Sequence, residues 1–231
     1  MREVHRSRRV RLGDVNASGR LRLDALARYL QDIAWDDAED AGVGAGRWVL
    51  RRVELRLTRL PTFGDEVDLV TSCSGAGSHW AERRTVVHGD RADVESAAIW
   101  VHVDDGGRPK PLDPGFASIW GEVPKVSARL RLPGPPKAAE VRPWPLRAGD
   151  IDVLGHLNNA VALAAVEDEL AHRTTGRRLV TADVEYRAAV DPGDTVAVAG
   201  VEDGDTVSVW LLVDGDVRVA ARVALAPASV R

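Results

Sequence analysis

The chain has 231 residues, of which 45% are hydrophobic and 29% are charged, the composition of an ordinary globular protein. Its formal net charge of −4 argues against a nucleic-acid-binding protein, and no apolar run approaches the roughly 20 residues needed to span a bilayer. Cys73 is the single cysteine, which excludes an intramolecular disulfide and a cysteine-based zinc cluster. The N-terminus lacks the apolar stretch of a signal peptide, so we expect a cytoplasmic protein.

The first half is predicted to contain a short strand, a polar loop, a helix and a strand meander, in that order. Leucines recur at spacings of three and four over residues 22–40, so this segment is predicted to be an amphipathic helix that ends near Gly42. The strand predicted at Val53–Leu60 alternates apolar and polar residues, and three further strands follow it: Val67–Ser72, Ala81–Val87 and Glu95–Val103. A Gly-Asp turn joins the last two of these strands.

The second half repeats this order. Residues 158–173 are apolar nearly all round the first turns, which predicts a buried helix. Three strands follow, with turns at Asp203-Gly204 and Asp214-Gly215: Thr195–Val201, Thr206–Val213 and Val217–Ala224. The proline-glycine segment at residues 132–137 between the halves can neither continue a helix nor join a sheet, so we expect an extended linker. The order of elements predicts an α+β fold.

Short matches in the same order indicate that the chain is a tandem duplication. The matched pairs are Gly13–Leu21 with Gly149–Leu157, Val53–Arg56 with Val184–Arg187, Gly64–Val67 with Gly193–Val196, and Val87–Asp90 with Val213–Asp216. Because the four pairs occur at similar spacing, chance is a poor explanation for them.

The chain resembles the fatty acyl-ACP thioesterase family of plants and bacteria over roughly residues 5–225. The segments that carry the resemblance are Leu30–Ala34, Trp48–Arg52, Arg59–Asp65, Arg83-Arg84, Ser96–Val101 and Asp150–Asn159. The resemblance implies two tandem hotdog domains, each a central helix wrapped by an antiparallel sheet. The expected N-terminal domain covers residues 1–132, the linker 133–142 and the C-terminal domain 143–231.

The resemblance also implies an enzyme that hydrolyses an acyl thioester to a fatty acid and a thiol. Acyl carrier protein or coenzyme A would be the donor, with no metal, no redox cofactor and no nucleic acid involved, and a homodimer is possible. The second half would supply the polar groups of an active site at the boundary of the halves. The first half would supply much of the acyl pocket.

The catalytic loop of the family reads Asp-x-Asn-x-His, which places Asp152 and His156 at the acidic and imidazole positions. Leu154 stands where the family has asparagine, and Ala189 and Val190 stand where plant members have a Glu-Cys pair. Asp152 would act as base or nucleophile, and His156 would orient it or the water, or protonate the leaving thiolate.

The start of a buried helix offers free amides and a positive dipole end to a thioester oxygen. The expected oxyanion and substrate-binding residues lie around this start: Gly155, Leu157, Asn158 and Asn159. The two asparagines could cap the helix or bind the pantetheine arm.

Other interpretations remain open from the residues alone. Asp152 could have a purely structural role, as an Asx-turn or capping residue, and His156 could be a structural loop residue. Glu167, at the helix position equivalent to Gln31, is a second candidate base. The departures at Leu154, Ala189 and Val190 favour a non-catalytic acyl-thioester-binding protein. An acyl-CoA thioesterase or hydratase on the same scaffold is a further alternative.

Overall fold

A computed structural model describes residues 2–43, 48–127, 131–174 and 176–227 of the chain. The chain divides into two compact units. The first unit contains Met1–Leu21 and Arg28–Leu130, and the second contains Arg22–Ala27 and Arg131–Arg231. None of the helices in these described ranges is long and apolar enough to cross a membrane.

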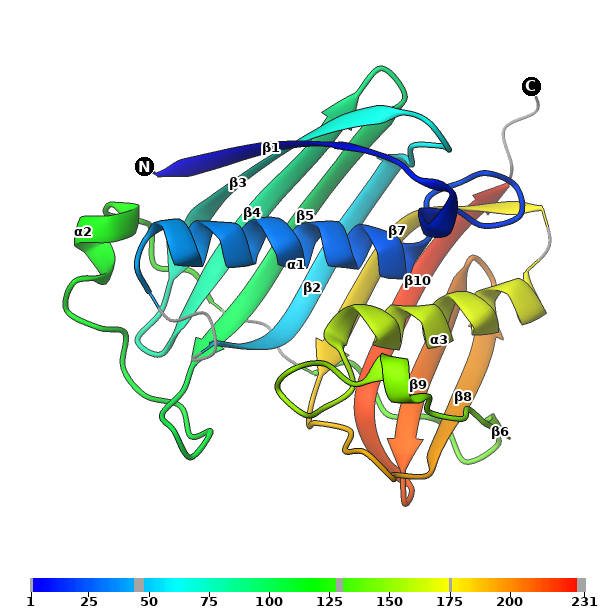
Figure 1. The fold of residues 1–231 in the computed structure, drawn as a ribbon. Helices are drawn as coiled ribbons and strands as arrows, with labels where there is room; N and C mark the ends of the chain where they lie inside the picture. Colours follow the sequence, from blue (N-terminus) through cyan, green and yellow to red (C-terminus); the bar gives the residue numbers. More distant parts are fainter. Residues whose placement is uncertain (1, 44–47, 128–130, 175, 228–231) are drawn as a thin grey trace. The chain divides into compact units, whose positions relative to one another are not determined.

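The first unit is built from an antiparallel sheet and most of a long helix, α1 (Leu23–Asp40), which crosses one face of the sheet in Figure 1. The residues of α1 up to Ala27 belong to the second unit. Its strands are β1 (Glu3–Arg9), β2 (Trp48–Arg59), β3 (Glu66–Ala76), β4 (Trp80–Gly89) and β5 (Ala92–His102). They pair in the order β1-β3-β4-β5-β2. A short helix, α2 (Phe116–Trp120), follows β5.

The second unit repeats this plan, with helix α3 (Asn159–Arg173) packed against β8 and β9. Its strands are β6 (Glu140–Pro143), β7 (Arg177–Tyr186), β8 (Val196–Asp203), β9 (Thr206–Val213) and β10 (Asp216–Pro227). They pair antiparallel in the order β7-β10-β9-β8-β6. The turn between β9 and β10 has positive φ at Asp214 (+53°) and Gly215 (+85°), as a type I′ hairpin turn requires.

Burial follows the predicted periodicities. On α1 the buried face includes Leu26, Tyr29 and Ile33, three or four residues apart. On β2 the buried Leu55 and Leu57 alternate with exposed charged residues, and each fully buried leucine contributes about 2 kcal/mol. The expected burial of the helix over residues 158–173 is also confirmed, because α3 buries small and aliphatic side chains on several faces of its first turns.

The α+β class and the main helices are confirmed. Six of the seven predicted strands are longer than predicted, and β9 has the predicted bounds. β6 begins at Glu140, inside the segment expected to be linker, because Glu140–Pro143 pairs with β8. α2 has only five residues, lies between Gly115 and Gly121, and could not be predicted from the sequence. A single turn is too short to show a helical period.

Candidate active site

The loop that precedes α3 is a tight, exposed turn. The amide of Asp152 donates to the carbonyl of His156 (2.9 Å), and the amide of Gly155 donates back to the carbonyl of Asp152 (3.0 Å). Gly155 has φ +86°, a conformation that favours glycine, and the space around its α-carbon is open. The turn itself therefore accounts for this glycine, without a close approach of other atoms.

Asp152 forms an Asx-turn and still presents one oxygen for chemistry. Its Oδ1 accepts a hydrogen bond from the amide of Leu154 (2.9 Å). Among the residues that the structure describes, its Oδ2 accepts one long hydrogen bond, from Asn158 Nδ2 (3.4 Å). The structural and the chemical interpretations of Asp152 are therefore compatible, because they use different oxygens.

The start of α3 uses some of its polar groups for the fold and leaves others available. Asn158 caps the helix, since its Oδ1 accepts from the amide of Ala160 (2.8 Å). The amides of Gly155, Leu157 and Asn158 donate to backbone carbonyls, and Leu157 is buried. In the described part of the chain, the amides of His156 and Asn159 donate to no protein acceptor.

Tyr186 at the end of β7 anchors the first residue of α3. Its hydroxyl donates to the carbonyl of Asn159 (2.9 Å). Burial raises the pKa of Tyr186, so the phenol keeps its proton and donates at any pH near neutrality. The backbone at the start of α3 is thereby held in place from β7.

His156 pairs with an acidic residue that the sequence analysis missed. Its Nδ1 lies 2.7 Å from Oδ1 of Asp191, which follows β7. Half of the His156 side chain is exposed, and 62% of the Asp191 side chain is exposed. The Asp-Pro-Gly-Asp sequence from Asp191 to Asp194 is a turn signature, but nothing in it identifies a histidine partner 35 residues away.

Glu167 has a contact at the start of α1. Its Oε2 accepts from the amide of Leu23 (2.7 Å), so the carboxylate of Glu167 caps that helix. Leu23 belongs with Arg22–Ala27 to the second unit, as Glu167 does. This contact gives Glu167 a role in the fold at the start of α1, and Glu167 stays a second candidate base.

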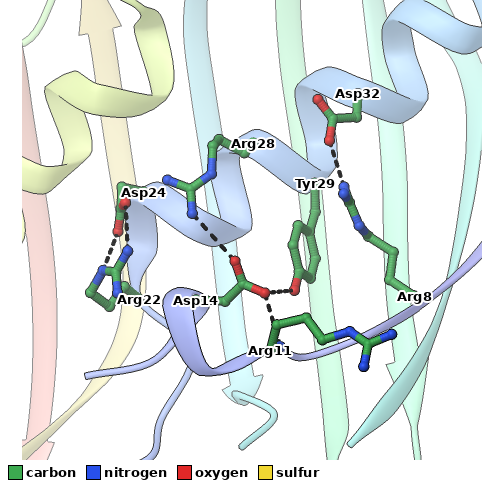
Figure 2. Close-up of polar contacts among 8 residues, drawn as sticks. All are labelled: Arg8, Arg11, Asp14, Arg22, Asp24, Arg28, Tyr29 and Asp32. Atoms are coloured by element: carbon green, nitrogen blue, oxygen red, sulfur yellow. Dashed lines mark hydrogen bonds and ion pairs between the residues drawn. The ribbon is translucent and has the colours of Figure 1, made fainter. Parts of the chain in front are cut away.

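The equivalent loop of the first unit has the same backbone but a different side-chain set. The amide of Ser18 donates to Oδ1 of Asn16 (3.1 Å), as the amide of Leu154 does to Asp152. Figure 2 shows Asp14 of this loop held by the amide of Arg11 (2.9 Å) and the hydroxyl of Tyr29 (2.6 Å). These bonds belong to the fold of the loop.

The first unit also contains an apolar pocket between α1, α2 and strands β2–β5. Its lining residues are Gln31, Ala34, Trp35, Ala38, Trp48, Cys73, Ala81, Glu82, Arg83, Trp100, Phe116 and Trp120. Burial raises the pKa of the Cys73 thiol, so this cysteine is an unreactive part of the wall. The pocket has the aromatic and aliphatic walls that a hydrocarbon chain requires.

The buried carboxylate of Asp37 bonds to two residues that line this pocket. Oδ2 of Asp37 accepts from Trp120 Nε1 (3.0 Å) and pairs with Arg83 (2.7 Å), while Oδ1 pairs with Arg2. Burial by itself raises the pKa of Asp37, but these hydrogen bonds and the charge of Arg83 outweigh it and hold the pKa below its usual value. No group of three His, Cys, Asp or Glu side chains in the described ranges could hold a metal ion.

Comparison with known proteins gives two family matches that together cover most of the chain. The N-terminal domain of acyl-ACP thioesterases matches residues 2–112, and the C-terminal domain of acyl-ACP thioesterases matches residues 134–222. An uncharacterized protein of Mycobacterium tuberculosis, Rv2001, is 26% identical over 215 residues, which are 90% of this chain and 86% of the relative.

Solved structures with the same fold cover nearly the full length. A proposed oleoyl thioesterase of Lactobacillus plantarum has a TM-score of 0.88 at 22% identity, over 99% of this chain and 98% of its own. A 12:0-ACP thioesterase of Umbellularia californica has a TM-score of 0.82 at 18% identity, over 97% of both chains. At such identities these likenesses establish the fold alone.

Proposed function

Because the chain belongs to the acyl-ACP thioesterase family and is therefore a thioester hydrolase, we propose that it releases fatty acids from acyl carrier protein at the start of α3. The observation that carries this site is the loop from Asp152 to His156, which presents a carboxylate oxygen and an imidazole beside the open N-terminus of a buried helix. The scaffold would be two tandem hotdog domains, covering residues 1–132 and 143–231.

The hydrolysis we propose uses water as the nucleophile. Oδ2 of Asp152 accepts one hydrogen of the water and orients it, and Nε2 of His156 takes the other as the water oxygen bonds to the thioester carbon. When the carbon–sulfur bond breaks, the sulfur leaves with the electron pair, and His156 returns its proton to the thiolate. The products are a carboxylic acid and the free thiol, and the enzyme regains its starting state.

The helix N-terminus would stabilise the charge that develops on the thioester oxygen. The amides of His156 and Asn159 are the available donors, and the positive end of the α3 dipole favours an oxyanion there. In this proposal Asn158 serves as a helix cap, because Ala160 already uses its side-chain oxygen. Its Nδ2 contributes by holding Asp152.

The apolar pocket of the first unit is the candidate for the acyl chain. Trp48, Trp100 and Phe116 provide aromatic walls, and Ala34 and Ala38 of α1 provide an aliphatic one. A fatty acyl group is therefore the substrate class that we propose.

The substitution Asp152→Asn tests the proposal with little risk to folding. The first unit makes the same turn with asparagine, because Asn16 accepts the amide of Ser18 as Asp152 accepts that of Leu154. We expect Asp152→Asn to keep its circular dichroism spectrum and to lose about 100-fold or more in kcat on acyl-ACP thioesters. Released thiol is the readout, with acyl-CoA of the same chain length in parallel. Full turnover by folded Asp152→Asn would remove Asp152 from the reaction.

A further inference from the structure

We infer that Asp191 is a positioning residue that holds His156 in the tautomer with a bare Nε2, an inference that rests on the proposed function. An ionised carboxylate can only accept a hydrogen bond. The 2.7 Å contact between Asp191 Oδ1 and His156 Nδ1 therefore places the hydrogen of the neutral imidazole on Nδ1. Nε2 is then the nitrogen that can take a proton from water.

The backbone brings the two side chains together. The amide of Leu157 donates to the carbonyl of Val190 (2.9 Å), which makes His156 and Asp191 neighbours on adjacent segments. The amide of Asp191 in turn donates to Oδ2 of Asp194 (2.8 Å), and the amide of Asp194 donates to the carbonyl of Asp191 (3.1 Å). The carboxylate of Asp191 is thus mounted on a closed turn.

The first unit contains the same turn without the acid. The amide of Leu21 donates to the carbonyl of Pro61 (2.9 Å), and the amide of Thr62 donates to Oδ2 of Asp65 (2.8 Å). The amide of Asp65 donates back to the carbonyl of Thr62 (3.1 Å). Thr62 therefore stands at the position of Asp191 in an equivalent hydrogen-bond pattern.

The turns at Thr62 and Asp191 show that the turn forms with or without a carboxylate at this position. The hydroxyl of Thr62 bonds inside its turn, to Oδ2 of Asp65 (3.0 Å), whereas the carboxylate of Asp191 is directed to His156. Half-exposed ion pairs contribute little to stability, so folding does not account for the acid at Asp191. A role in orienting the imidazole does account for it.

Asp191 also lies close to a second position at which this chain departs from the family pattern. Plant members of the family carry a glutamate at the position of Ala189, two residues earlier, and Ala189 has no side chain that could reach an imidazole. The structure assigns the carboxylate of this segment to Asp191 instead. The proposed active site therefore contains two acidic residues, Asp152 and Asp191.

The substitution Asp191→Thr tests the inference, because Thr62 shows that the turn accepts threonine. We expect kcat on acyl-ACP to fall about 10- to 100-fold, with KM within about twofold of wild type. Nitrogen-15 NMR of the His156 ring should show the Nδ1–H tautomer in wild type at a pH where the ring is neutral, and the Nε2–H tautomer should gain in the variant. Asp216→Asn, which removes an exposed acid from the β9–β10 turn, should leave both readouts unchanged.

The outcomes separate this inference from the proposed function. If wild-type His156 carries its hydrogen on Nε2, or if Asp191→Thr keeps full kcat while His156→Ala loses it, Asp191 does not position the imidazole. If His156→Ala and Asp152→Asn both keep full turnover, the proposed site is wrong. The tautomer measurement needs no turnover and still decides the role of Asp191 in that case.

Discussion

Leu154 is the residue of the loop whose chemistry differs most from the family pattern, and the first unit shows what a polar side chain does there. Ser18 stands at the equivalent position, and its hydroxyl donates to Oδ1 of Asn16 (2.8 Å). A polar group at position 154 should therefore reach Asp152. The side chain of Leu154 is 56% exposed, so its replacement costs little packing.

We predict that Leu154→Asn raises kcat by roughly fivefold, the effect of about 1 kcal/mol from one additional hydrogen bond to the carboxylate or its water. Steady-state thiol release is the measurement. Val153→Asn is the matched control, since Val153 is 94% exposed on the same turn. An equal rise in both variants would show that loop polarity, not the contact with Asp152, changes the rate.

Single residues of the site could be predicted from the sequence only where they lie close together in it. Asp152, His156 and the helix cap Asn158 fall within seven consecutive positions, so their proximity needs no tertiary information. Asp191 could not be found in this way, because its contact with His156 depends on a backbone hydrogen bond between Leu157 and Val190.

At the scale of elements, α1 presents small side chains to the apolar pocket. Ala34 and Ala38 lie one turn apart on α1, and both line the pocket together with Trp48 and Trp100. Their size leaves the space that a larger side chain would fill. The width of the pocket is therefore a property of this face of the helix.

We predict that Ala34→Leu shortens the acyl chain that the enzyme prefers. Leucine is a good helix former, so α1 should persist while the added carbons occupy pocket volume. On a C8 to C18 acyl-ACP series, kcat/KM should fall about tenfold for the longest chains and less than threefold for the shortest. An equal loss at every length would instead indicate general damage to the fold.

The elements show which patterns in a sequence predict structure well. The period of α1 and the hairpin turn at Asp214-Gly215 predicted both elements closely, because each signal is local. β1 and β6 were expected only as unplaced short strands. Their positions depend on pairing with β3 and β8, which the sequence pattern does not contain.

At the scale of the whole molecule, carboxylates with lowered pKa values gather in one unit. They are Asp14, Asp37 and Asp65, and all three belong to the first unit. In each, burial by itself raises the pKa, and hydrogen bonds and arginine charges lower it further than burial raises it. Folding therefore favours the ionised form of these groups.

The sign of the pH dependence follows from that shift. A carboxyl whose pKa is lower in the folded state stabilises the protein at pH values above its ordinary pKa, near 3.8. This stabilisation is lost as the pH falls through the pKa of the folded state. We therefore predict that the first unit loses stability steeply below about pH 4. Five of the seven tryptophans lie in the first unit, so tryptophan fluorescence reports its unfolding: Trp35, Trp48, Trp80, Trp100 and Trp120.

Asp37→Asn should separate this cause from general acid unfolding. The loss of a buried negative charge beside Arg83 and Arg2 should lower the free energy of unfolding at pH 7 by about 2 kcal/mol. This is less than the cost of breaking a fully buried ion pair, because Arg2 keeps access to solvent. Between pH 5 and pH 3, the free energy of unfolding of this variant should fall by less than that of wild type. Asp36→Asn removes the neighbouring exposed acid, which pairs with Arg6, and should keep the wild-type profile. Parallel profiles for wild type and Asp37→Asn would mean that other carboxyls control the acid stability of the first unit.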